Sequence, residues 1–136
     1  MSHKRTDIRD ALVDLLVGGA TDAGSNVFSN RVFNIPQSKL PAIKVYHDEE
    51  NVSPRDISSR FYVRKLSMKI EMYVEGDGYE TSLDDLCQQV EDVMSANRSI
   101  SGTAINSSLT GTEFSYEPAE KTVGKATLSY EITYSS

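Results

Sequence analysis

The sequence predicts an α+β fold: a single domain, residues 1–136, in which a largely antiparallel or mixed β-sheet is covered by two α-helices. Two segments repeat apolar residues with helical spacing, and several others alternate apolar and polar residues as strands do. In chain order these segments are a helix, two or three strands, a helix and two strands. A chain of this length is typical of one domain and can bury a sizeable core without disulfides or metals.

The first predicted helix spans residues 6–17. Its apolar stripe consists of Ile8, Ala11, Leu12, Leu15 and Leu16. We expect Thr6 to cap the start of this helix, because a threonine side chain can accept a hydrogen bond from the first turn. Gly18 and Gly19 should end it, since glycine adopts the left-handed conformation that often follows a helix.

The segment between the first helix and the longest strand is the least regular. Residues 21–26 are small and polar and predict a loop, and a short strand is expected at residues 27–33. A second strand is expected at residues 42–46, after Pro41. Residues 47–59 predict a polar connector, which we expect to be mobile in the free subunit and ordered on assembly.

The longest predicted strand spans residues 62–75. Its apolar positions alternate with polar ones and are Leu66, Met68, Ile70, Met72 and Val74. Such alternation predicts one covered face and one face that meets solvent or a partner. Gly76 and Gly78 mark a turn after this strand.

The second predicted helix spans residues 82–97, and Ser82 and Asp85 at its start resemble a capping box. Its inner stripe includes Cys87. Residues 99–108 predict a loop. Two final strands are expected at residues 112–117 and 125–134 and are joined as a loose hairpin.

The composition excludes several classes of protein. Fourteen Lys and Arg against twenty Asp and Glu give a net charge of −6, which disfavours a generic nucleic-acid binder. No apolar run approaches the roughly 20 residues that cross a bilayer, and a secretory segment is not indicated. The single cysteine, Cys87, excludes an intrachain disulfide and is consistent with a reduced, cytoplasmic environment.

No motif predicts an enzyme, a cofactor site or a metal site. Cys87 lies on an apolar helix stripe and is best interpreted as a small buried hydrophobe. His3 and His47 lack a second ligand at a useful spacing, and the acidic run after His47 is typical of a solvated loop. Asp84 and Asp85 diverge in direction on a helix, so they complement the helix dipole rather than form a catalytic pair.

Two stretches of opposite charge follow one another in the chain. The basic stretch contains one acid, Asp56, and the residues Arg55, Arg60, Arg64, Lys65 and Lys69. The acidic stretch contains no Lys or Arg and consists of Asp77, Glu80, Asp84, Asp85, Glu91 and Asp92 with their neutral neighbours. These residues form either a head-to-tail contact between subunits, which closes into a ring, or charge pairs between a strand and a helix of one chain.

The order and spacing of several motifs resemble the tail terminator proteins of long-tailed, non-contractile bacteriophages of the lambda type. In the first half the matching residues are Arg5, Ile8, Arg9, Ala11, Leu12 and Leu15, then Leu40, Pro41, Ala42, Ile43, Val45 and Tyr46. In the second half they are Leu66, Ile70, Glu71, Tyr73 and Val74, then Leu83, Asp84, Leu86, Val93 and Met94, and finally Gly111, Glu113, Phe114, Leu128, Tyr130, Ile132, Thr133 and Tyr134.

The resemblance implies a structural protein without catalytic residues or cofactors. It implies a homo-oligomer, a hexameric ring that caps the tail tube protein, stops tube growth and meets the head-completion or neck proteins. DNA would only pass through the lumen, no membrane is involved, and the protein would lie at the tail–head junction after assembly in the host cytoplasm. The alternatives are a neck or head–tail connector component and, in another class, a small-molecule-binding regulatory domain with an apolar pocket.

Overall fold

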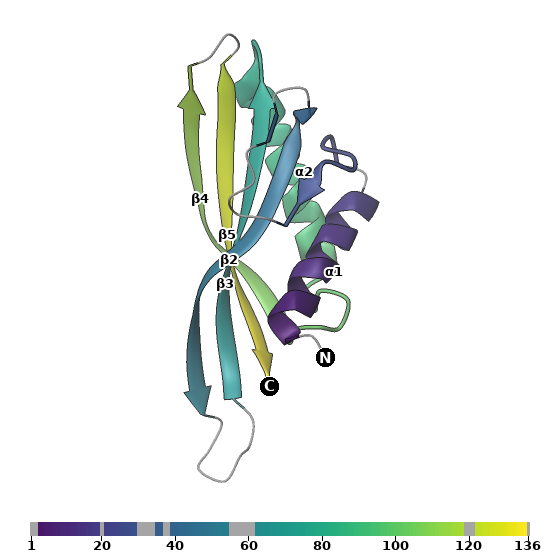
Figure 1. The fold of residues 1–136 in the computed structure, drawn as a ribbon, viewed down its shortest axis with the longest axis vertical. Coiled ribbons are helices and arrows are strands. Elements are labelled where there is room, and N and C mark those ends of the chain that lie inside the picture. The colour runs from purple at the N-terminus through teal and green to yellow at the C-terminus, as the bar shows by residue number, and fades with distance from the viewer. Residues whose placement is uncertain are drawn as a thin grey trace.

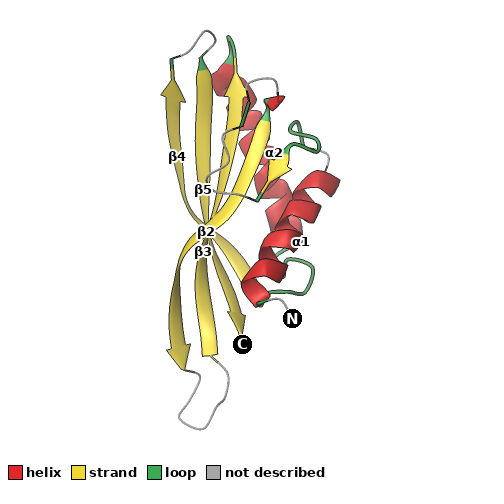
Figure 2. Ribbon diagram, in the orientation of Figure 1, coloured by secondary structure: helices red, strands yellow, loops and turns green. Residues whose placement is uncertain are grey.

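The computed structural model of the chain describes residues 3–19, 21–29, 35–36, 39–54, 62–118 and 122–135. In these parts of the chain, two helices lie on one face of a five-stranded mixed sheet, which confirms the predicted α+β fold (Figure 1, Figure 2). The elements are α1 (Lys4–Gly18), β1 (Val27–Phe28), β2 (Ala42–Pro54), β3 (Tyr62–Glu75), α2 (Tyr79–Ala96), β4 (Asn106–Glu117) and β5 (Val123–Ser135).

The strand order of the sheet is β1-β2-β3-β5-β4. β1 is parallel to β2 and pairs only two residues with it, whereas the other neighbouring strands are antiparallel. β3 lies at the centre and pairs along its length with both β2 and β5. β2 and β3, accompanied by the C-terminal part of β5, extend beyond the helices at one end of the molecule, while the end at which β4 and β5 are connected lies opposite (Figure 1).

The hydrophobic core lies between the two helices and the face of the sheet that they cover. Alternate residues of β3 and β5 face it, as the sequence predicts, and the two helix stripes close it. Fully buried members include Ile8, Leu12, Leu16, Leu66, Met68, Ile70, Met72, Leu86, Val90, Leu128 and Ile132. Burial of a side chain of this size contributes about 1.5–3 kcal/mol, so these residues dominate the stability of the fold.

The ends of α1 differ from the prediction. Nδ1 of His3 accepts a hydrogen bond from the backbone N–H of Arg5 at 3.1 Å, so His3 caps the helix before Thr6 is reached. Gly19 follows the helix with φ −76°, not in the left-handed conformation. A Cβ at Gly19 would lie 2.5 Å from Cγ2 of Val93, so glycine is needed here because α2 passes close to the chain.

The start of α2 also lies outside the predicted range. The helix begins at Tyr79, directly after Gly78, which has φ 77° and supplies no side chain to cap it. The backbone N–H of Ser82 donates to the carbonyl of Gly78, so Ser82 lies inside the first turn and the predicted capping box was wrong. The left-handed glycine turns the chain so sharply that the helix forms before the residues expected to cap it.

The polar segment after Tyr46 is the largest correction. Residues 47–54 continue β2 as a strand that pairs with β3, for example Glu50 with Leu66 and Ser53 with Val63, with an irregularity between His47 and Glu49. The predicted loop was therefore wrong over this part. Backbone pairing with β3 defines the strand here, because beyond the helices there is no core to impose an apolar pattern. The rest of the predicted connector, residues 55–59, lies outside the described residues.

Other strand boundaries shift less. Of the strand predicted at residues 27–33, the structure shows Val27–Phe28 as β1, and residues 30–34 lie outside the described parts. β4 begins at Asn106, inside the predicted loop 99–108, because its polar first half pairs with β5. β5 begins two residues earlier than predicted, at Val123.

Candidate interaction site

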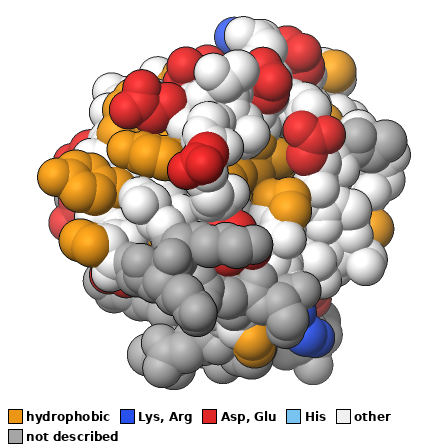
Figure 3. Space-filling view, turned by 90° about the horizontal axis from the view of Figure 1, so that it is seen from above, with side chains coloured by type: hydrophobic (Ala, Val, Ile, Leu, Met, Phe, Trp, Pro, Cys, Tyr) orange, Lys and Arg blue, Asp and Glu red, His pale blue; other side chains and the backbone are white. Residues whose placement is uncertain are grey.

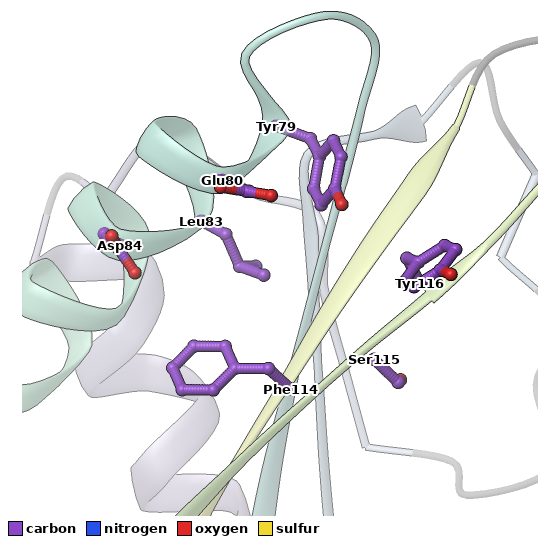
Figure 4. Close-up of a pocket in the computed structure, with 7 residues that line it drawn as sticks. All are labelled: Tyr79, Glu80, Leu83, Asp84, Phe114, Ser115 and Tyr116. Carbon is purple, nitrogen blue, oxygen red and sulfur yellow. The ribbon is translucent and has the colours of Figure 1, made fainter.

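An open hollow of about 380 Å³ lies between the start of α2 and the edge strand β4. Tyr79 and Leu83 line it from the helix, and Phe114 and Tyr116 line it from the strand. Phe114 and Tyr116 project from β4 toward the side on which α2 lies (Figure 4). Phe114 is 61% exposed and Tyr116 is 64% exposed. We call this hollow the α2–β4 groove.

Strand register explains why two aromatic side chains share the groove. Phe114 lies opposite Ala126 of β5, and Tyr116 lies opposite Gly124. Since Ala126 faces the core, Phe114 and Tyr116 lie on the helix side of the sheet. A Cβ at Gly124 would lie 2.4 Å from Cδ2 of Tyr79, so the Tyr79 ring rests directly on the glycine backbone and forms one wall of the groove.

The rim of the groove is acidic. Glu80 and Asp84 line it from the first turns of α2, and Asp77 lies in the turn just before the helix. Residues 77–96 contain no Lys or Arg. Seen from above, this end of the molecule shows hydrophobic side chains lying among Asp and Glu (Figure 3). An apolar floor with a negative rim suits an apolar segment that carries Lys or Arg.

The opposite face of the sheet carries a polar network centred on Glu71, which is only 7% exposed. The hydroxyls of Tyr46 and Tyr73 donate hydrogen bonds to its carboxylate, and Lys125 Nζ lies 3.3 Å from Oε2. Burial alone would raise the pKa of Glu71, but these hydrogen bonds and the charge of Lys125 outweigh it and hold that pKa below its ordinary value. The Glu71 carboxylate is therefore ionised at neutral pH.

Two of the predicted basic residues lie on this same uncovered face. Lys69 Nζ donates to Oγ of Ser129 at 2.8 Å, and Lys65 Nζ lies 3.9 Å from Oε1 of Glu131. Among the described residues, the salt bridges of β3 involve β2 and β5, and none joins β3 to α2. Lys65 and Lys69 alternate along β3 with the core residues Leu66, Met68 and Ile70, so they lie on the other side of the sheet from the acidic helix.

Arg64 lies on the helix side and is held within the subunit. Its Nη1 lies 2.9 Å from Oε2 of Glu50, which also accepts a hydrogen bond from Arg5 of α1 at 2.8 Å. Tyr134 donates a hydrogen bond to the other carboxylate oxygen. Burial opposes ionisation of Glu50, but the hydrogen bonds from Tyr134 and Arg64 and the charge of Arg5 hold its pKa below the ordinary value.

The structure thus places the predicted interface residues in separate groups. Arg55 and Arg60 lie outside the described residues. Glu80 and Asp84 line the α2–β4 groove, Asp77 lies in the turn before α2, and Asp85 and Glu91 lie elsewhere on α2. Sequence reasoning missed the groove itself. The sequence does contain one signal for the groove. Phe114 and Tyr116 lie two positions apart in a predicted strand, and this spacing places both aromatic side chains on the same face of the sheet.

Cys87 is buried, as predicted. Burial raises its pKa to about 11, and the negative charges of Glu91 and Asp84 act in the same direction. A thiol in that state is a poor nucleophile. In the described parts of the chain, no group of three or more His, Cys, Asp and Glu side chains could hold a metal ion. No helix there is both long and apolar enough to span a membrane.

Residues 3–134 match the family of the phage minor tail protein U. The chain belongs to this family and is therefore a structural component of a phage tail. No curated protein sequence matches the chain significantly. One solved chain, from the virion of a native gene transfer agent particle, is similar at 15% identity and a TM-score of 0.43, covering 99% of this chain and 100% of that chain.

Proposed function

We propose that this chain is a tail terminator: a subunit of a hexameric ring that caps the finished tail tube and provides the surface for head joining. The family match over residues 3–134 carries the proposal, because it makes the chain a minor tail protein. The open α2–β4 groove supports it, since a subunit of a ring needs exposed surfaces that its neighbours cover.

A cap of this kind acts by mass action at one interface. The ring covers the axial surface of the last tube ring and presents a different outer face, so the next tube subunit finds no complementary partner. Its affinity for the tube end must exceed that of another tube ring, or tube growth would compete with capping. The other face of the ring then meets the head-completion or neck proteins.

The charge of the subunit suits a channel through which DNA passes without binding. Each copy carries a net charge of −6, and a ring multiplies this charge. The resulting field repels duplex DNA and disfavours adhesion to the wall of the lumen. The passage of DNA needs no base-reading surface.

Neighbouring subunits are proposed to meet through the two stretches of opposite charge. Lys65 and Lys69 lie on the uncovered face of the sheet and the acids of α2 on the other side, so these groups can contact each other only between copies. Lys69→Glu should weaken assembly, and a second reversal at Asp84 or Glu91 should partly restore it. Arg64 is a poorer probe, because its reversal also breaks the bond to Glu50.

The decisive experiment removes the protein from the phage. Particles assembled without it should carry tails longer than normal that fail to join heads. Purified protein, added to such extracts before the tubes overgrow, should restore both tail length and joining. Cys87→Ala serves as a matched control that should restore both equally well, since the Cys87 side chain is buried in the subunit. Tails of normal length without the protein would instead identify a neck component.

A further inference from the structure

We propose that an extended segment of another virion protein adds as a strand to the free side of β4 along residues 112–117. This segment carries Lys or Arg at two positions four residues apart, with an apolar residue beside each of them in the stretch between. The contact requires only that the chain is a structural tail protein, so it goes beyond the capping function and does not depend on it.

The backbone of β4 is open to such a strand. β4 is the last strand in the order of the sheet and pairs only with β5 among the described strands, so alternate N–H and C=O groups point away from the sheet at its border (Figure 1). The pairing with β5 is irregular between Leu109 and Gly111 and regular from Gly111 to Glu117. Since an irregularity discourages pairing with a foreign strand, the receptive stretch is residues 112–117.

The side chains of this stretch form two different surfaces. Phe114 and Tyr116 lie on the helix side of the sheet and are mostly exposed, at the α2–β4 groove. Glu113 and Glu117 alternate with them, so they lie on the uncovered side, where both are exposed. Among the described residues, neither glutamate forms a salt bridge, and β4 itself contains no Lys or Arg. The free strand is therefore aromatic on one side and acidic on the other.

A complementary strand must repeat this alternation. Its residues opposite Phe114 and Tyr116 also face the helix side, where β-branched or other apolar side chains pack well against aromatic rings. Its residues opposite Glu113 and Glu117 face the uncovered side, where Lys or Arg can pair with the carboxylates. The partner segment therefore reads basic, apolar, any residue, apolar, basic. This pattern is the same in both directions, so it fits a parallel or an antiparallel strand.

A second copy of this chain does not supply the strand. The pattern occurs at residues 60–64 and 65–69 of the sequence. Residues 63–69 lie within β3 and pair with β2 on one side and with β5 on the other, so their backbone is already engaged. Pairing of β4 with β4 of a second copy would bring acids together without any Lys or Arg on either strand. The occupant is therefore a segment of a different protein.

Binding of short peptides to the purified chain tests the contact. The probe is a fluorescein-labelled nonapeptide, Thr-Thr-Lys-Val-Thr-Val-Lys-Thr-Thr, and the matched control peptide has Glu at both Lys positions. Fluorescence anisotropy should show that the Lys peptide binds about tenfold more tightly than the Glu peptide. Bound Lys peptide should slow hydrogen–deuterium exchange within residues 112–117, because its backbone protects the amides at the edge of the sheet.

Charge exchange on β4 gives a second readout. Glu113→Lys combined with Glu117→Lys should reverse the preference, so that the Glu peptide binds about tenfold more tightly than the Lys peptide. Asp10→Lys with Asp14→Lys changes the net charge by the same amount on α1 and is the control, which should keep the preference of the parent. All four acids are exposed, so thermal unfolding of both variants should match the parent.

Each outcome decides between the alternatives. Absence of binding, equal binding of the Lys and Glu peptides, or slowed exchange only outside residues 112–117 would overturn the proposed contact. An unchanged preference in the Glu113 and Glu117 variant would do the same. None of these results bears on capping, because that function is tested by the length of tails assembled without the protein.

Discussion

Arg5 of α1 and Glu50 of β2 form a salt bridge, with Nη1 2.8 Å from Oε2, although 45 residues separate them in the chain. The side chain of Glu50 is 12% exposed and lies where the sheet leaves the helices. Because Arg64 and Tyr134 bind the same carboxylate, Glu50 ties the first helix and the last strand to the base of the projecting end. The projection is thereby oriented relative to the core.

Glu50→Gln should lower the free energy of unfolding by about 2 kcal/mol, because two guanidinium groups lose a charged acceptor. Urea denaturation at pH 7 measures the loss. Glu49→Gln, on the exposed neighbouring residue, is the matched control and should change stability by less than about 0.5 kcal/mol. Equal stability of the two variants would show that the Glu50 network contributes little.

Stability should fall steeply in acid. Glu50 and Glu71 both have pKa values below the ordinary 4.5 in the folded state, so the unfolded chain binds more protons at these groups than the folded one. Their contribution is complete above pH 4.5 and is lost as the pH falls through the lowered values. Urea midpoints from pH 7 to pH 3 measure this. The double variant Glu50→Gln with Glu71→Gln should show a flatter profile, and a profile as steep as the parent would place the effect elsewhere.

Cys87 should react only slowly with thiol reagents in the folded protein. Its thiol is buried and its pKa is raised to about 11, so little thiolate forms at pH 8. A thiol reagent should label the native protein slowly and the urea-unfolded protein rapidly. Cys87→Ala should cost about 1 kcal/mol, which is typical of a small core truncation. Labelling of the native protein as fast as the unfolded one would contradict the burial.

Gly124→Ala should disturb the α2–β4 groove. The new methyl group would meet the Tyr79 ring, which must move, and the cost should be about 1–3 kcal/mol. Gly111→Ala on β4 is the control, because nothing lies within 4 Å of a Cβ there. Combining Gly124→Ala with Tyr79→Ser should cost less than the sum of the two single changes, since the clash is then relieved. Additive costs would mean that the ring does not rest on the glycine.

The regular parts of this fold could be predicted from the sequence. The stripe of Ile8, Leu12 and Leu16 and the alternation of β3 and β5 report burial directly, because each of these elements has one face in the core. The polar half of β2 could not be predicted in this way. Its residues have no core to face, and their strand conformation follows from pairing with β3, which a local pattern does not report.

The interaction site was predicted less completely. The charge pattern identified the acids around the groove, because residues 77–96 contain several Asp and Glu and no Lys or Arg, which can be read directly from the sequence. It could not show that Arg64 is neutralised by Glu50, fourteen residues away, or that Lys65 and Lys69 face away from α2. The groove also depends on the contact between Tyr79, the first residue of α2, and Gly124 of β5. These residues are far apart in the sequence, so no local pattern reports their contact.

The two edges of the sheet differ in how well they are protected against pairing with a strand of another molecule. Beyond its short pairing with β1, β2 presents a strand irregularity, the acids Asp48 and Glu49, and a proline at its end, all of which discourage pairing with a foreign strand. β4 presents exposed Phe114 and Tyr116 instead. Growth of a fibre by strand-to-strand addition requires two receptive edge strands on every molecule, and among the described strands only β4 is receptive. Strand-to-strand addition at β4 would therefore join two copies without continuing into a fibre.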